Sequence, residues 1–223
     1  MKLSKRTKEI LNNFVSINDS IIFQEGNTIS TKSIEGNVIA RAKVEEYFPQ
    51  EFAISNLAEF LNVIALFDEP EITFEENLCK ISEGGKLVIY ASGNKDLIRN
   101  NPPKEFKPPE WDLEFNLLNK DYKQIKKASA ILSQDMVRFV SQDGQLVAKT
   151  FSNDISTHAT ANSFDIVIKD SVDGNPNAVF PEKNMRLMDA DYAVSISFKG
   201  ISQFKSGDLT YWIALHTSSS NEE

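Results

Sequence analysis

Several residue types are scarce in this chain of 223 residues, and each absence excludes something. A single cysteine, Cys79, forms no internal disulfide and suits a reducing compartment. The two histidines, His158 and His216, lack a partner spacing suited to metal binding or acid-base catalysis. No run approaches the roughly 20 apolar residues of a membrane span, and no secretory signal opens the chain. We therefore expect a cytoplasmic protein without catalytic residues, cofactor or metal.

Positive charge is also in deficit. Lysine and arginine number 24 against 32 acidic residues, which gives a formal net charge of −8. This balance argues against a protein that coats nucleic acid or membrane with its whole surface, but it leaves room for a local basic stripe. The hydrophobic share of 41% is that of an ordinary soluble protein with a real core.

Proline is concentrated near the middle, in NNPPKEFKPPEWD, where two proline pairs follow Asn101. Each proline fixes φ, removes an amide donor and favours an extended preceding residue, so this stretch is typical of a linker. It predicts two domains, residues 1–105 and 106–223. The terminal TSSSNEE is expected to be a frayed acidic tail.

A pattern of one short helix followed by antiparallel strands occurs four times, in residues 3–33, 52–91, 113–151 and 178–216. Ser55 and Asn119 are the expected N-caps of the second and third helices, and Pro181 the expected start of the fourth. Strand alternation requires the apolar helix faces to cover the sheets, which predicts an α+β fold of strand-helix-strand repeats.

The outward faces of three of these helices carry cations. In the third helix, Asn119 to Leu132, four lysines lie opposite the side of Tyr122 and Ile125. Like charges on one exposed face repel one another, which suggests an anion opposite them. The outward positions are Lys5, Lys8 and Asn12 in the first helix, Lys120, Lys123, Lys126 and Lys127 in the third, and Lys183 and Arg186 in the fourth.

The opening MKLSK, the following NF and IN, the glycine and isoleucine of EGNTIST, and the proline-rich midpoint resemble the DNA polymerase sliding clamp of T-even-type bacteriophages. The resemblance implies two similar clamp domains per subunit and three subunits in a head-to-tail ring. Helices would line the hole and antiparallel sheets would form the outer wall. The cationic positions above, with Asn12, would then face duplex DNA. The second helix offers Asn56, Glu59 and Asn62 but no cation.

The resemblance also implies partners. These are duplex DNA, encircled without sequence preference, a DNA polymerase, a separate ATP-dependent clamp loader and the late-transcription machinery, all in the cytoplasm of an infected bacterial host. The candidate residues for an apolar partner cleft are Phe106, Trp111, Ile213 and Leu215. Sheet edges are natural subunit joints, and the candidates there are Val88 and Tyr90 in KLVIYA and Thr157 and Thr160 in STHATANSF.

Two other interpretations remain open at this stage. A solvated surface helix explains a lysine face without any ligand, and a β-rich viral structural or scaffold protein would carry the same repeats for assembly. A hydrolase is disfavoured because no nucleophile and base form a recognisable constellation. Asp68 to Pro70 and Asp189 to Asp191 are expected to be polar turns, and Trp212 and Cys79 to be buried.

Overall fold

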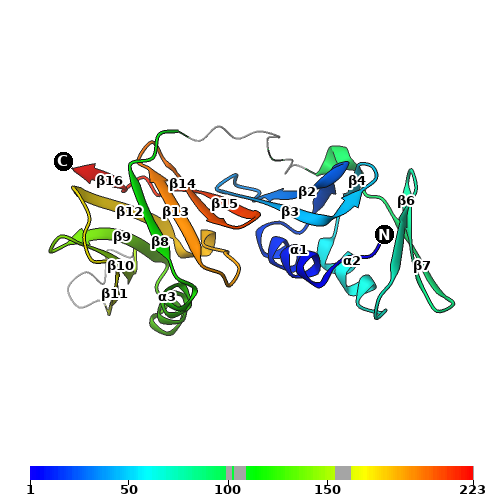
Figure 1. Ribbon diagram of the computed structural model, residues 1–223, viewed down its shortest axis with the longest axis horizontal. Helices are drawn as coiled ribbons and strands as arrows, with labels where there is room; N and C mark the ends of the chain where they lie inside the picture. The colour runs from blue at the N-terminus through cyan, green and yellow to red at the C-terminus, as the bar shows by residue number, and fades with distance from the viewer. Residues whose placement is uncertain (99–101, 103–108, 154–161, 223) are drawn as a thin grey trace. The chain divides into compact units, whose positions relative to one another are not determined.

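The computed structural model describes residues 1–98, 102, 109–153 and 162–222 (Figure 1). The chain divides into two compact units, Met1–Glu105 and Phe106–Glu223, which we call unit 1 and unit 2. Each unit combines helices with antiparallel sheets, which confirms the predicted α+β class. Within the described residues, no helix combines the length and the apolar character that a membrane crossing needs.

Within its described residues, unit 1 begins with a helix and contains seven strands. Its elements are α1 (Lys5–Ile17), β1 (Ile21–Phe23), β2 (Gly26–Lys32), β3 (Val38–Phe48), β4 (Phe52–Ile54), α2 (Leu57–Ile64), β5 (Glu71–Phe74), β6 (Leu78–Glu83), β7 (Lys86–Ala91) and the short 3-10 helix η1 (Lys95–Leu97). β1 pairs with β4, β2 with β3, and β5, β6 and β7 form a three-stranded sheet, all antiparallel.

The core of unit 1 lies between its helices and strands. α1 and α2 pack against each other, and α1 also packs on β2 and β3 (Figure 1). The apolar sides of both helices cover the core as predicted, since each of the following residues is at most 9% exposed: Leu3 just before α1, Ile10, Leu11, Phe14, Leu57, Phe60, Leu61 and Ile64. Phe23 stacks on Phe48 at 4.3 Å between ring centroids and meets Phe60 edge-on. The polar faces of α1 and α2 therefore point away from this core.

Unit 2 contains one α-helix and nine strands within its described residues. They are β8 (Leu113–Leu117), α3 (Asn119–Leu132), β9 (Met136–Gln142), β10 (Gln145–Phe151), β11 (Phe164–Lys169), β12 (Asn175–Pro181), the short 3-10 helix η3 (Glu182–Asn184), β13 (Tyr192–Ser197), β14 (Ile201–Ser206), β15 (Leu209–Ala214) and β16 (Ser220–Glu222). One antiparallel sheet has the order β11-β10-β9-β12-β16, and β15, β14, β13 and β8 pair in that order.

α3 covers the sheet of unit 2 through a narrow apolar stripe. Tyr122, Ile125 and Ser129 are buried, one helical turn apart, and α3 packs on β9, β10 and β11. Phe139 lies behind them and contacts both Phe115 and Phe180 through its ring. The rest of the helix surface faces away from the core.

The prediction of a fourth helix is wrong. Pro181 is the last residue of β12, and only the single turn η3 follows it. Beyond η3 a side chain bonds to two of the backbone groups that a longer helix would pair internally: the Tyr122 hydroxyl donates to the Met185 carbonyl and accepts from the Leu187 N–H. Because these groups are satisfied by a buried tyrosine, the chain gains nothing from continuing as a helix.

The predicted N-caps are also displaced. α2 is capped by Asn56, not Ser55, with the Asn56 side chain accepting from the N–H of Glu59 at 3.0 Å. Asn119 is the first residue inside α3, and its N–H donates to the carboxylate of Asp191 at 2.7 Å. A carboxylate distant in sequence therefore performs the capping that local sequence signals would assign to a neighbouring residue.

Candidate nucleic-acid interface

The start of α1 is fixed by both a local and a distant group. The Oγ of Ser4 accepts a hydrogen bond from the N–H of Thr7 at 3.2 Å. The carboxylate of Glu46, from β3, accepts from the Ser4 N–H and, at 2.6 Å, from the Thr7 hydroxyl. Burial raises the pKa of Glu46, but these hydrogen bonds outweigh burial and hold it below the ordinary value. β3 thus orients the first helix and its polar face.

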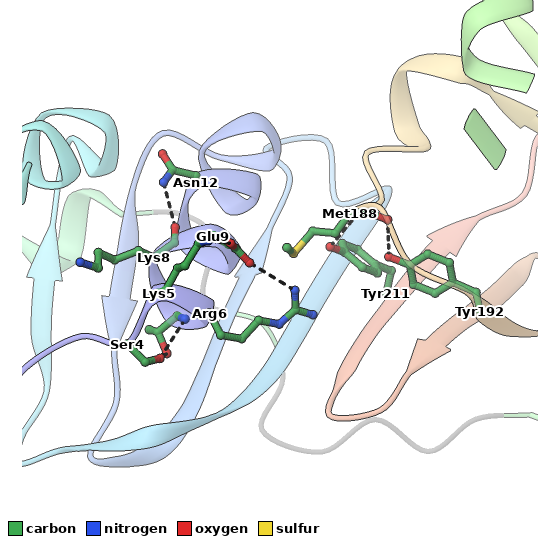
Figure 2. A network of polar contacts seen from close by, with 10 residues as sticks. Ser4, Lys5, Arg6, Lys8, Glu9, Asn12, Met188, Tyr192 and Tyr211 are labelled. Atoms are coloured by element: carbon green, nitrogen blue, oxygen red, sulfur yellow. Dashed lines mark hydrogen bonds and ion pairs between the residues drawn. The ribbon is translucent and has the colours of Figure 1, made fainter. Parts of the chain in front are cut away.

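That polar face carries cations and a carboxylate together. Lys5 is almost fully exposed, and Lys8 is half-buried one turn further on. Figure 2 shows Arg6 directed at Glu9, with 3.7 Å between Nη1 and Oε2, and the Asn12 amide donating to the Lys8 carbonyl. The Lys5 ammonium lies 4.0 Å from the same Glu9 carboxylate. α1 therefore presents positive charge that is partly balanced.

The second helix, α2, adds polar groups to this region but no positive charge. Asn62 of α2 lines a pocket of about 200 Å³ together with Lys8 and Asn12 of α1. Asn56 caps α2 and Glu59 is exposed, as the sequence suggested for an outward face. An anion held beside Lys8 would therefore meet amide groups from both helices.

All four lysines of α3 are exposed, but their surroundings differ. Lys123 is paired with Asp189 at 3.0 Å, and the Lys126 ammonium lies 5.5 Å from the centre of the Tyr122 ring. Among the residues that the structure describes, Lys120 and Lys127 make no ion pair. Two of the four charges are thus available to an anion without displacing anything.

Lys183 and Arg186 lie in and just after η3, on the segment that Tyr122 of α3 holds by hydrogen bonds. Both side chains are exposed, and the Arg186 Nε donates to the Lys183 carbonyl at 2.8 Å. Both cations therefore lie on a segment that is bonded to α3, although the helix predicted to carry them is absent.

The residues proposed for a partner cleft are not equivalent. Trp111 and Leu215 are half-buried, while the Ile213 side chain is fully buried and contributes to the core rather than to the surface. Phe106 lies outside the described residues, as do Thr157 and Thr160 of the proposed subunit joint. The partner cleft stays a prediction.

β7 is an edge strand of its sheet, paired with β6 alone among the described strands. Val88 and Tyr90 are half-buried, and Tyr90 turns inward, with its ring edge-on to Phe60 and its hydroxyl donating to the Asn56 carbonyl. Burial raises the pKa of Tyr90 to about 12. The opposite side of β7 exposes Leu87 by 57% and Ile89 by 60%.

Four residues were missed by the sequence analysis. Strand alternation in KLVIYA separates Leu87 and Ile89 from the chosen Val88 and Tyr90, so the period-2 pattern could have found them. Arg6 lies at the border of the polar face of α1, where a helical projection is ambiguous. No sequence signal pairs Asp189 with Lys123, because that contact depends on how the chain returns to α3.

Chemistry other than binding finds little support in the described part of the chain. Its histidines, cysteine and carboxylates form no cluster suited to a metal ion. Cys79 is fully buried, as expected, and burial raises the pKa of its thiol to about 12, so it is not a reactive thiolate. Trp212 is buried too, as expected, and His158 lies outside the described residues.

Two family models match the chain in succession. Residues 2–95 match a model described as DNA polymerase processivity factor, and residues 114–217 match one described as gp45 sliding clamp, C terminal. Among solved structures, PCNA from A. fulgidus, determined with the C-terminal region of FEN-1, has a TM-score of 0.66 at 15% identity, covering 99% of this chain and all of that one. The DNA polymerase III β chain from Streptococcus pneumoniae has a TM-score of 0.69 at 12% identity over 98% of this chain; the chain spans only 65% of its length.

Curated relatives agree over nearly the full length. The sliding clamp of Vibrio phage KVP40 is 34% identical over 96% of this chain and 98% of its own. The sliding clamp of Escherichia phage RB69 is 27% identical over the whole of both chains. These matches decide against the scaffold-protein alternative, and the solved structures show the same fold. The chain belongs to the sliding-clamp family of DNA polymerase processivity factors.

Proposed function

We propose that three copies of this chain close head to tail into a ring around duplex DNA and tether the replicative DNA polymerase during viral DNA replication. Units 1 and 2 are then the two clamp domains of each subunit. The observation that carries the proposal is the exposed lysine face of α3 in a chain whose net charge is −8. Because acidic residues prevail on the rest of the chain, duplex DNA is attracted to this basic surface inside the ring and repelled elsewhere.

The cations suit sliding better than gripping. Phosphate contacts carry no sequence information, so one contact is interchangeable with the next along the duplex. Lysine supplies seven of the eight proposed cationic positions, and its ammonium is a flexible, strongly hydrated point charge rather than a rigid two-pronged donor. Encirclement then prevents loss of the polymerase by keeping its effective concentration at the template high.

The ring would close through strand edges. β7 in unit 1 and β11 in unit 2 are both edge strands of six residues, and each exposes apolar side chains, Leu87 and Ile89 on one and Val167 on the other. Pairing β7 of one subunit with β11 of the next gives a heterologous contact that repeats around the ring. It also covers backbone groups that an isolated edge leaves open.

Further partners follow from this role. A separate ATP-dependent loader must open and place the ring, because the sequence has no glycine-rich phosphate-binding loop of its own. Polymerase, loader and late-transcription factors would bind short segments through surfaces such as that around Trp111 and Leu215. All act in the cytoplasm of the infected host cell.

The number of subunits is open to direct test. We expect native mass spectrometry over a dilution series to show one species at three times the 25.1 kDa mass of the chain, giving way to monomer as concentration falls. A monomer at every concentration, or a dimer, would contradict the three-subunit ring.

A further inference from the structure

Three buried tyrosines hold the segment between η3 and β13 in one conformation. Tyr122 bonds to the backbone of its first residues, as described above. The Met188 N–H donates to the Tyr211 hydroxyl at 3.3 Å, and the Tyr192 hydroxyl donates to the Met188 carbonyl at 2.8 Å (Figure 2). All three rings are at most 1% exposed. Hydrogen bonds from buried tyrosines therefore anchor the backbone of this segment at Met185, Leu187 and Met188.

This anchored segment ends in two carboxylates that both reach α3. Asp191 accepts from the N–H of Asn119 at 2.7 Å and so fixes the segment to the first turn of the helix. Asp189, two residues earlier, lies 3.0 Å from the ammonium of Lys123. With Met188 and Asp191 both held, the backbone at Asp189 is kept beside Lys123.

The pair is nonetheless open to solvent. The side chains of Lys123 and Asp189 are 54% and 60% exposed. Ion pairs of this kind are weak, because water and salt screen both charges. A phosphate arriving at Lys123 can therefore displace the carboxylate at little cost. In unit 1 an exposed carboxylate also accompanies the cations, but on the same helix: Glu9 of α1 lies within 4.0 Å of both Lys5 and Arg6.

We propose that Asp189, and Glu9 in the same way, act as intramolecular counter-ions that compete with DNA phosphate for the cations of the inner wall and so lower the friction of sliding. This inference rests on the proposed function. When a phosphate moves away, the waiting carboxylate takes its place, so the lysine does not have to be left unpaired between successive phosphates. The cations attract the duplex without holding any one position along it.

The test measures one-dimensional diffusion of labelled, loaded clamps on end-blocked linear duplex DNA. We expect D189N to diffuse roughly two- to fivefold more slowly than the unsubstituted clamp, the range set by the strength of exposed ion pairs, with a steeper dependence on salt. K123Q should diffuse at least as fast as the unsubstituted clamp. The double variant K123Q/D189N should diffuse at the same rate as K123Q, because without the Lys123 ammonium there is no cation for Asp189 to neutralise.

The control is E75Q, which breaks an exposed pair with Lys80 and changes the net charge equally. It should leave diffusion unchanged. Unaltered diffusion in D189N overturns the inference, as does faster diffusion, which would mean that Asp189 positions Lys123 for phosphate. Slowing by D189N that persists in the K123Q background overturns it too. If unsubstituted clamps are not retained on end-blocked DNA at all, the proposed function itself fails.

Discussion

The triple substitution K123E/K126E/K127E is expected to reduce the amount of clamp loaded onto circular DNA, and the stimulation of polymerase, by about tenfold or more at physiological salt. Each reversal replaces an attraction for phosphate by a repulsion, and all three positions lie on the exposed side of one helix. The slope of log loading efficiency against log salt should also flatten by about 0.9 for each phosphate contact that is lost. Loading assays with a titration of salt measure both effects.

A matched triple separates position from charge. Lys43, Lys199 and Lys205 are exposed, and Lys43 and Lys205 lie on strand faces directed away from the core. K43E/K199E/K205E makes the same change in net charge away from the α3 face, and it should leave loading within about twofold of the unsubstituted clamp. Equal loss in both triples would show that only total charge matters. Undiminished polymerase stimulation by the K123E/K126E/K127E variant would contradict the assignment of α3 to the inner wall.

The largest effect on assembly is expected from β7. L87D/I89D places two carboxylates where Leu87 and Ile89 now expose apolar surface at an open strand edge. If that edge is covered by a neighbouring subunit, the change forfeits the burial of two large side chains and buries unpaired charge instead. We expect the subunit dissociation constant to rise about a hundredfold or more, measured by native mass or sedimentation over a dilution series.

The comparison variant for this prediction is L66D/L97D. Leu66 and Leu97 are exposed by 65% and 77%, but neither belongs to a strand edge. L66D/L97D replaces two exposed apolar side chains of the same size by aspartate and should leave the assembly intact. If L87D/I89D still assembles, β7 does not form the subunit interface. If both variants fail to assemble, the effect comes from the loss of exposed apolar groups in general and not from the β7 edge.

The periodicity of apolar residues predicted much of the fold. The helical periodicity of apolar residues in α1 and α2 predicted that one face of each helix is buried, because a helix that covers a sheet must place its apolar residues at 3.6-residue intervals. The lysine face of α3 followed from the same rule. The helix-and-strand pattern predicted four times along the chain, together with the resemblance to phage clamps, led to the family that the comparisons then showed.

Contacts between distant parts of the chain could not be predicted. The missing fourth helix is explained by Tyr122, which lies over sixty residues earlier and takes the backbone bonds that a helix would have used. The cap of α3 likewise comes from Asp191 rather than from a neighbouring residue. Local propensity is a weak guide wherever a buried side chain offers the backbone another partner.

The most direct test of encirclement compares the same loaded clamp before and after a single cut in its DNA. On covalently closed circles the clamp should remain bound through gel filtration in high salt, since only opening of the ring releases it. After one double-strand cut far from the loading site it should slide off the end and elute free, and blocked ends should restore retention. Equal retention on closed and cut DNA, or loss from both as salt rises, would contradict a closed ring and indicate ordinary electrostatic binding.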